Sequence, residues 1–153
     1  MPACVRSMLA GFVATVVLSL LMLMKGAMGI MPALNPVAML SGMAHTMMGL
    51  PAMPAIGWMA HFLIGTVLWG LLFAVLYFRL PGRTPLVKGM AFSVLAWLLM
   101  MLLPLPLPMA GAGLFGMKMG MMAPVMTLVM HLIWGAVLGY TYGKLTPRNA
   151  AAA

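Results

Sequence analysis

Four long apolar stretches dominate this sequence, at residues 5–24, 57–79, 87–103 and 124–143. A helix needs about 20 apolar residues to cross the hydrocarbon core of a bilayer, and these stretches have close to that length or more. The sequence therefore predicts an all-α membrane protein that folds as a bundle of four transmembrane helices. We expect one domain over residues 1–149, followed by a disordered alanine tail at residues 150–153.

Proline residues in the connecting segments mark further boundaries. Proline alternates with leucine at residues 104–108, and because proline cannot continue a hydrogen-bonded helix, the third stretch should end there. Between the first two stretches, Asn35 and Pro36 supply an N-cap followed by a proline at the first helical position. We therefore expect a short interfacial helix at residues 36–48, in the first outer loop, lying on the membrane.

Side-chain carboxylates are absent, since the 153 residues include eight Lys and Arg but no Asp and no Glu. This composition excludes carboxylate acid–base catalysis, Ser-His-Asp triads, oxygen cages for calcium or magnesium, and acidic proton relays. We therefore do not expect an enzyme. The cations stand singly at the ends of apolar runs rather than clustered on a polar face, so a nucleic-acid partner is not expected either.

The distribution of these cations predicts the orientation in the membrane. Cytoplasmic segments carry an excess of Lys and Arg. If both termini are cytoplasmic, two cations lie outside, Lys25 and Lys118, and six lie inside: Arg6, Arg79, Arg83, Lys88, Lys144 and Arg148. A competing interpretation is that the first stretch is a cleaved signal peptide, because Arg6 precedes it and small residues follow it.

The same pair of helices occurs twice in the sequence. Val5-Arg6-Ser7-Met8 opens the first stretch as Val87-Lys88-Gly89-Met90 opens the third. His61 in the second stretch and His131 in the fourth both begin the pattern His-x-x-x-Gly-x-Val-Leu. A unit with two crossings repeats in the same orientation, which predicts a parallel 2+2 repeat about a pseudo-twofold axis along the membrane normal. Chance similarity between apolar segments is the alternative.

Small residues recur at spacing four and so lie on one face of their helices. Close approach of helices in lipid depends on such residues. We expect them to form packing seams within the chain, with a homodimer seam as the alternative. The first stretch contributes Ser7, Gly11, Thr15 and Ser19, and the fourth contributes Gly135, Gly139 and Gly143.

Several segments resemble a known family. They are Gly-Phe-Val-Ala-Thr at residues 11–15, His61-x-x-x-Gly-Thr-Val-Leu-Trp-Gly, Leu-Pro-Gly at residues 80–82, and His131-Leu-Ile-Trp-Gly-Ala-Val-Leu-Gly. Through these segments, the chain resembles a family of small four-helix bacterial integral membrane proteins that is classed as a domain of unknown function. The resemblance implies a multi-pass protein of the bacterial inner membrane and implies no activity.

His61 and His131 are the sharpest candidate site. An ionisable side chain within a span is costly to insert and usually faces the bundle interior. The predicted symmetry places the two imidazoles opposite each other in the outer half, as axial histidines of a b-type haem are placed in a four-helix bundle. Gly65 and Gly135, four residues further on, would leave room for the porphyrin edge, and Lys25 and Lys118 could meet its propionates. The alternative is a structural pair of neutral histidines that bond to carbonyl or hydroxyl groups.

Methionine gives a second signal, because 19 of the 22 methionines lie in the outer half and only Met1, Met8 and Met90 lie in the inner half. Thioethers are soft ligands that suit Cu(I). The candidate metal-binding clusters are Met43, His45, Met47 and Met48 in the first outer loop and Met117, Met119, Met121 and Met122 in the second. Methionine also fills irregular apolar surfaces, so packing against a partner is the alternative.

Three functions follow from these patterns. The first is an accessory or assembly subunit that docks onto a larger membrane complex, such as a respiratory one, or onto a second copy of itself. The second is a metal protein that holds copper or haem b on the outer side. The third, a small transporter or channel, has the least support, because the spans carry few polar groups to solvate a passing solute.

Overall fold

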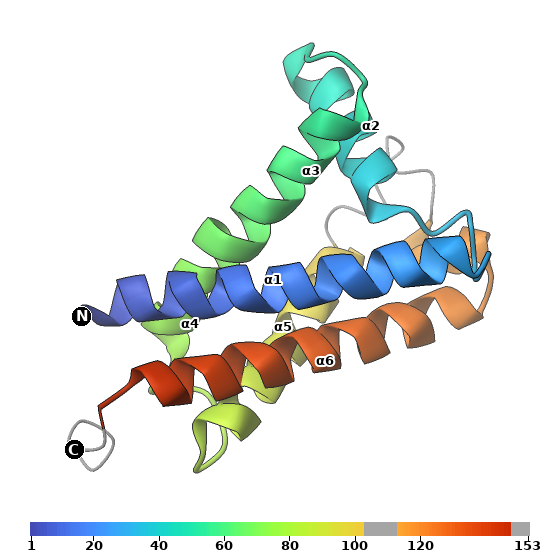
Figure 1. Cartoon of the computed structure of the whole chain (residues 1–153). Coiled ribbons are helices and arrows are strands. Elements are labelled where there is room, and N and C mark those ends of the chain that lie inside the picture. Colours follow the sequence, from blue (N-terminus) through green and yellow to red (C-terminus); the bar gives the residue numbers. More distant parts are fainter. Residues whose placement is uncertain (103–112, 148–153) are drawn as a thin grey trace.

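The computed structural model describes residues 1–102 and 113–147, and its regular elements within those ranges are all helices (Figure 1). Four helical segments are long and apolar enough to cross a membrane, which confirms the predicted all-α architecture. They are α1 (Ala3–Ala27), the second span (Pro54–Leu76), α5 (Pro85–Leu102) and α6 (Met122–Leu145). The second span consists of α3 (Pro54–Leu63), a π-helix η1 (Ile64–Leu68) and α4 (Trp69–Leu76). The proline segment at 104–108, Arg148 and the predicted tail at 150–153 fall outside the described residues.

The short helix predicted between the first two spans is present as α2 (Pro36–Met48). Its N-cap is Asn35, whose side chain accepts a hydrogen bond of 3.1 Å from the Ala38 amide, and it ends at Gly49 in a left-handed conformation (φ 68°). The helix runs antiparallel to α3, since Gly57 lies directly against the Val37 carbonyl and Ser41 Oγ donates to the Met53 carbonyl at 2.9 Å. This helix and the start of the second span therefore form a hairpin.

The small-residue face of α1 packs against the second span. A Cβ on Gly11 would lie 2.8 Å from the Gly65 carbonyl oxygen, and Ser7 Oγ donates a 2.6 Å hydrogen bond to the Gly70 carbonyl. Thr15 lies directly over Gly65. Because the contacts are made between backbones, no larger residue would fit at Gly11 without separating the helices.

The glycine face of α6 packs in the same way against α5. Gly89 of α5 contacts the backbone of both Gly135 and Gly139, and a Cβ on Gly143 would lie 3.1 Å from the Pro85 Cβ. Both predicted seams therefore lie between consecutive spans of this chain.

The two helix pairs make corresponding contacts. When Val5 is aligned with Val87, and His61 with His131, the contact of Gly11 with Gly65 corresponds to the contact of Ser93 with Gly135. Arg6 and Lys88 occupy aligned positions as well, and each contacts a tyrosine of the other helix pair. The Arg6 Cζ atom lies 5.8 Å from the Tyr142 ring centroid, and the Lys88 Nζ atom lies 4.5 Å from that of Tyr77. The glycine contacts agree with the predicted parallel 2+2 repeat, whereas the two tyrosines occupy positions that do not align.

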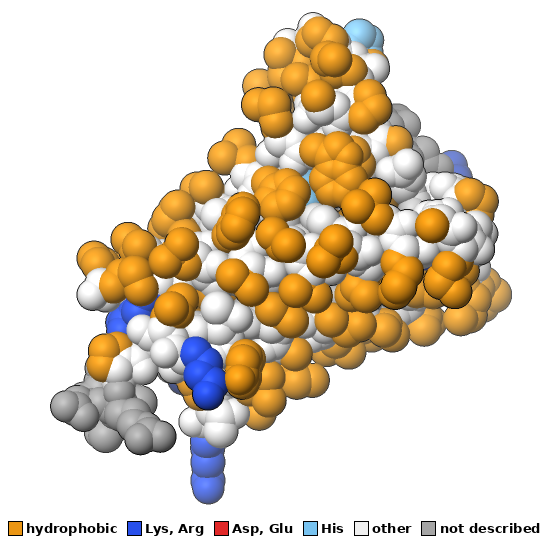
Figure 2. Space-filling view, viewed as in Figure 1, with side chains coloured by type: hydrophobic (Ala, Val, Ile, Leu, Met, Phe, Trp, Pro, Cys, Tyr) orange, Lys and Arg blue, Asp and Glu red, His pale blue; other side chains and the backbone are white. Residues whose placement is uncertain are grey.

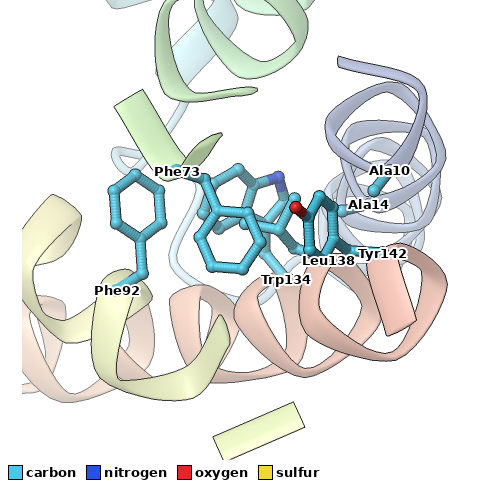
Figure 3. Packing of buried hydrophobic residues seen from close by; sticks show 7 residues of the cluster. All are labelled: Ala10, Ala14, Phe73, Phe92, Trp134, Leu138 and Tyr142. Atoms are coloured by element: carbon cyan, nitrogen blue, oxygen red, sulfur yellow. The ribbon is translucent and has the colours of Figure 1, made fainter. Parts of the chain in front are cut away.

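An aromatic core joins the two pairs in the half of the bundle that contains the termini (Figure 3). The Phe73 ring centroid lies 5.2 Å from that of Phe92 and 5.3 Å from that of Tyr142. The core contains Ala10, Ala14, Phe73, Phe92, Trp134, Leu138 and Tyr142, all nearly or fully buried. Burying several large aromatic side chains here holds this end of the bundle closed.

The pairs diverge towards the opposite end. Within the described residues, no Cα atom of α3 lies within 8 Å of one in α5 or α6. The α2–α3 hairpin projects from the bundle in Figure 1, whereas α1 keeps its contact with α6. This divergence leaves space between the two halves.

Candidate functional site

A chamber of about 390 Å³ occupies the space between the diverging helix pairs. Its lining comes from α1, α2, the second span, α5 and α6, and is predominantly apolar. Trp69 and Trp134 border it on the side of the aromatic core, so that core closes its inner end. Both His61 and His131 line the chamber, so the fold brings together the two histidines that the repeat pattern singled out.

His61 is held by a hydrogen bond to α1. Its Nε2 atom lies 3.1 Å from Ser19 Oγ, and the Ser19 hydroxyl itself donates to the Thr15 carbonyl at 2.7 Å. Because the single hydroxyl proton of Ser19 is used in that bond, its oxygen accepts from the imidazole, and we assign the proton of His61 to Nε2. The Trp58 and Phe62 rings meet the imidazole edge-on, with centroids at 5.8 and 5.7 Å. The neutral tautomer thus has a lone pair on Nδ1.

His131 has the opposite tautomer. Its Nδ1 atom lies 2.7 Å from the Thr127 carbonyl oxygen, which can only accept a hydrogen bond. The imidazole proton is therefore on Nδ1 and the lone pair on Nε2. A backbone carbonyl bonded to Nδ1 is the usual arrangement behind a metal-ligating or hydrogen-bonding Nε2.

The chamber also gathers five methionines from four helices: Met22, Met39, Met43, Met100 and Met130. All five are half-buried. Met43 is the only one of them that belongs to the predicted metal-binding clusters. The others were missed, although Met39 and Met43 share a helix face by their spacing of four, and Met130 precedes His131 in the sequence.

The glycines do not provide the space predicted for a porphyrin edge. Gly65 borders the chamber, but the side chain of Thr15 occupies the position where its Cβ would be. Gly135 does not border the chamber and is packed against Ser93. The prediction failed because a glycine that lets two backbones approach looks the same in a sequence as one that makes room for a ligand.

Lys25 and Lys118, the cations predicted to meet haem propionates, have other surroundings in the structure. The ammonium group of Lys25, which is 9% exposed, donates to the carbonyls of Ile30, Met31 and Leu34 at 3.0, 3.0 and 2.8 Å. All three of its donors are used in fixing the loop after α1. Lys118 is exposed and does not border the chamber. Lys25 therefore borders the chamber with its ammonium group bonded to carbonyl groups, and Lys118 lies away from the chamber.

Comparison with known proteins identifies the family. The model of a family of unknown function, DUF6789, matches residues 1–153. The chain belongs to this family. The predicted membership of a family classed as a domain of unknown function is thus confirmed. No curated protein and no solved structure matches the chain.

The remaining residues of the predicted loop clusters lie apart from the chamber of this DUF6789 member. His45 is exposed, and its Nδ1 atom lies 2.8 Å from the Leu50 carbonyl oxygen. Met119 packs near Met101, Trp97 and Phe115. Five methionines of these clusters are more than half exposed: Met47, Met48, Met117, Met121 and Met122. Within residues 1–102 and 113–147, no group of three or more His, Cys, Asp or Glu is placed to hold a metal ion.

The second span contains one irregularity that the sequence did not predict. The π-helix η1 inserts between α3 and α4 and includes Gly65, next to the chamber. The hydroxyl of Thr66 within it is buried and has no hydrogen-bond partner. Short π-helical turns often occur at functional sites, which makes this wall of the chamber notable.

Proposed function

We propose that this protein is a non-enzymatic binding protein of the bacterial inner membrane, and that its ligand occupies the chamber in contact with His61 and His131. The observation that carries the proposal is that one histidine from each helix pair lines a single chamber. Ionisable side chains inside a membrane-spanning bundle are expensive and usually functional. The volume of about 390 Å³ lies within the range of about 300–1,000 Å³ typical of small-molecule sites.

The proposal includes an orientation with both termini in the cytoplasm. In Figure 2 most of the visible Lys and Arg side chains gather at the end of the molecule where the termini lie. Since cytoplasmic segments are enriched in these residues, the chamber lies in the outer half of the membrane.

The closed inner end supports binding rather than transport. The aromatic core joins α1, α4, α5 and α6 below the chamber, and Phe73, Phe92 and Leu138 are fully buried in it. A solute would have to displace this core to cross. The chain has no Asp or Glu to bind a cation or carry a proton along the way.

The test is to identify what the full-length protein carries after purification in a mild detergent. We expect a bound metal or small molecule at a fixed ratio to protein, detected by elemental analysis, a visible spectrum and mass spectrometry of an organic extract. The His61→Ala and His131→Ala variants should lose it, whereas His45→Ala, outside the chamber, should retain it. A wild-type protein that carries only bulk lipid, in the same amount as the variants, would contradict the proposal.

An accessory role is the second candidate, and a different observation favours it. Met47 and Met48 at the end of α2 are 64% and 72% exposed, and Met121 and Met122 at the start of α6 are 82% and 61% exposed. Exposed methionines are typical of adaptable protein-binding surfaces. Cross-linking in native membranes should then join this outer end to a larger complex, and replacing the four methionines with serine should abolish the product. Cross-links that persist in that variant would exclude this surface.

A further inference from the structure

The neutral donor side chains that dominate the chamber lining are thioethers and imidazoles, beside the Lys25 ammonium group and the hydroxyls of Thr15 and Thr127. The thioethers belong to Met22, Met39, Met43, Met100 and Met130, and the imidazoles to His61 and His131. The whole sequence contains no side-chain carboxylate. Thioether and imidazole donors favour Cu(I), whereas calcium, magnesium and manganese require oxygen ligands.

Each chamber histidine has one nitrogen whose lone pair is not engaged in a hydrogen bond to the protein in the described residues. The bond from His131 Nδ1 to the Thr127 carbonyl leaves the Nε2 lone pair free, and the bond from His61 Nε2 to Ser19 leaves the Nδ1 lone pair free. Partners of this kind fix the tautomer and the ring orientation of metal-ligating histidines. No other protein hydrogen bond engages either free nitrogen in the described residues.

Charge favours a monovalent ion. The free-energy cost of moving an ion into an apolar medium rises with the square of its charge, and here no anionic ligand would compensate it. Lys25 also borders the chamber, and its ammonium group is held by three carbonyl groups of the loop after α1. Zn²⁺ is usually held by three or four His, Cys or carboxylate ligands. The chamber offers two histidines, and the single cysteine, Cys4, is exposed near the opposite end of α1.

We infer that the chamber binds Cu(I) through His61, His131 and thioethers of its methionine lining. This inference rests on the proposed function and names its ligand. It differs from the haem hypothesis, because Thr15 and Ser93 occupy the space beside Gly65 and Gly135, and because His61 uses its Nε2 atom to bond Ser19. The site is built from side chains of both helix pairs, so bound Cu(I) would also tie the diverging halves together.

The experiment is an anaerobic titration of the full-length protein in detergent with Cu(I), in competition with a chromogenic Cu(I) chelator. We expect one Cu(I) per chain, with nitrogen and sulfur neighbours in the X-ray absorption spectrum. The variants His131→Ala and Met130→Leu should weaken binding at least tenfold. The matched controls His45→Ala and Met48→Leu, which change the same residue types outside the chamber, should bind as the wild type does.

A further variant tests the histidine geometry. Ser19→Ala removes the partner of His61 without touching a proposed ligand, and loss of such a partner lowers metal affinity by about 10–100-fold. If His131→Ala fails to fold, as judged by circular dichroism and gel filtration, His131→Gln and Ser19→Ala carry the test.

Three results would overturn the copper site. In the first, the control variants weaken Cu(I) binding as much as the chamber variants do. In the second, the X-ray absorption spectrum shows no sulfur neighbours. In the third, the protein does not bind Cu(I). If a histidine-dependent haem or organic ligand is found instead, the copper inference fails and the binding function stands. If the protein carries no histidine-dependent ligand of any class, both fail.

Discussion

The seam between α5 and α6 offers a quantitative test of the fold, through the substitution Gly89→Ala. A Cβ at Gly89 would lie 2.6 Å from the Gly139 nitrogen and 2.7 Å from its Cα. Ordinary carbon contacts are about 3.5–4.0 Å, so the helices would have to separate by about 1 Å. Overpacking of this kind costs about 1–3 kcal/mol. Since the atoms in the way belong to the backbone and cannot rotate aside, we expect a loss near 3 kcal/mol, or about 100-fold in the unfolding equilibrium.

The matched control is Gly42→Ala in α2, where an added Cβ would meet nothing within 4 Å. Replacing a glycine in an open helical position should raise stability by up to about 1 kcal/mol. The assay is reversible unfolding in mixed micelles with increasing SDS, followed by circular dichroism. Equal stability of the two variants would refute the close packing of α5 on α6. Gel filtration of Gly89→Ala would show in addition whether the substitution alters the oligomeric state, which an intrachain seam should leave unchanged.

Two further predictions concern the end of the bundle opposite the termini. Lys25→Met removes the ammonium group that donates to the carbonyls of Ile30, Met31 and Leu34. Amide hydrogen exchange in residues 28–36 should therefore accelerate at least tenfold. The control Lys118→Met should leave the exchange rates unchanged. An unaltered exchange rate in Lys25→Met would show that this loop is held in another way. Asn35→Ala removes the N-cap of α2 and should lower the local free energy of unfolding by about 1 kcal/mol. Amide hydrogen exchange at Ala38 and Met39 should then become roughly fivefold faster. Exchange at the wild-type rate would mean that the cap contributes nothing.

The helices could be predicted from local patterns. The predicted spans at residues 5–24 and 124–143 lie within α1 and α6, which extend two to three residues further at each end. The Asn35-Pro36 pair located the start of α2, because capping and the fixed φ of proline are properties of neighbouring residues. The π-helix was not predictable in this way, since it depends on how Gly65 fits beneath Thr15 of another helix.

The candidate site was predicted in part. The repeated pattern around His61 and His131 pointed to two histidines near one another, and both line the chamber. Gly135 packs against Ser93, Lys25 bonds to three carbonyl groups and Lys118 lies away from the chamber, and four of the five chamber methionines were missed. A sequence of this kind has methionine and glycine almost everywhere, so their abundance conceals which copies face the interior.

Sequence alone predicted four helices that are long and apolar enough to cross a membrane, and it showed that the chain has no Asp or Glu. These properties follow from the length, hydropathy and residue types of individual segments, which do not depend on how distant segments pack. Tertiary structure decided where the helices touch and where they separate. Glycine contacts close the seams, the aromatic core closes one end, and the divergence of the helix pairs opens the chamber that joins His61, His131 and the methionines. Such contacts depend on the relative placement of distant segments, which no local pattern encodes.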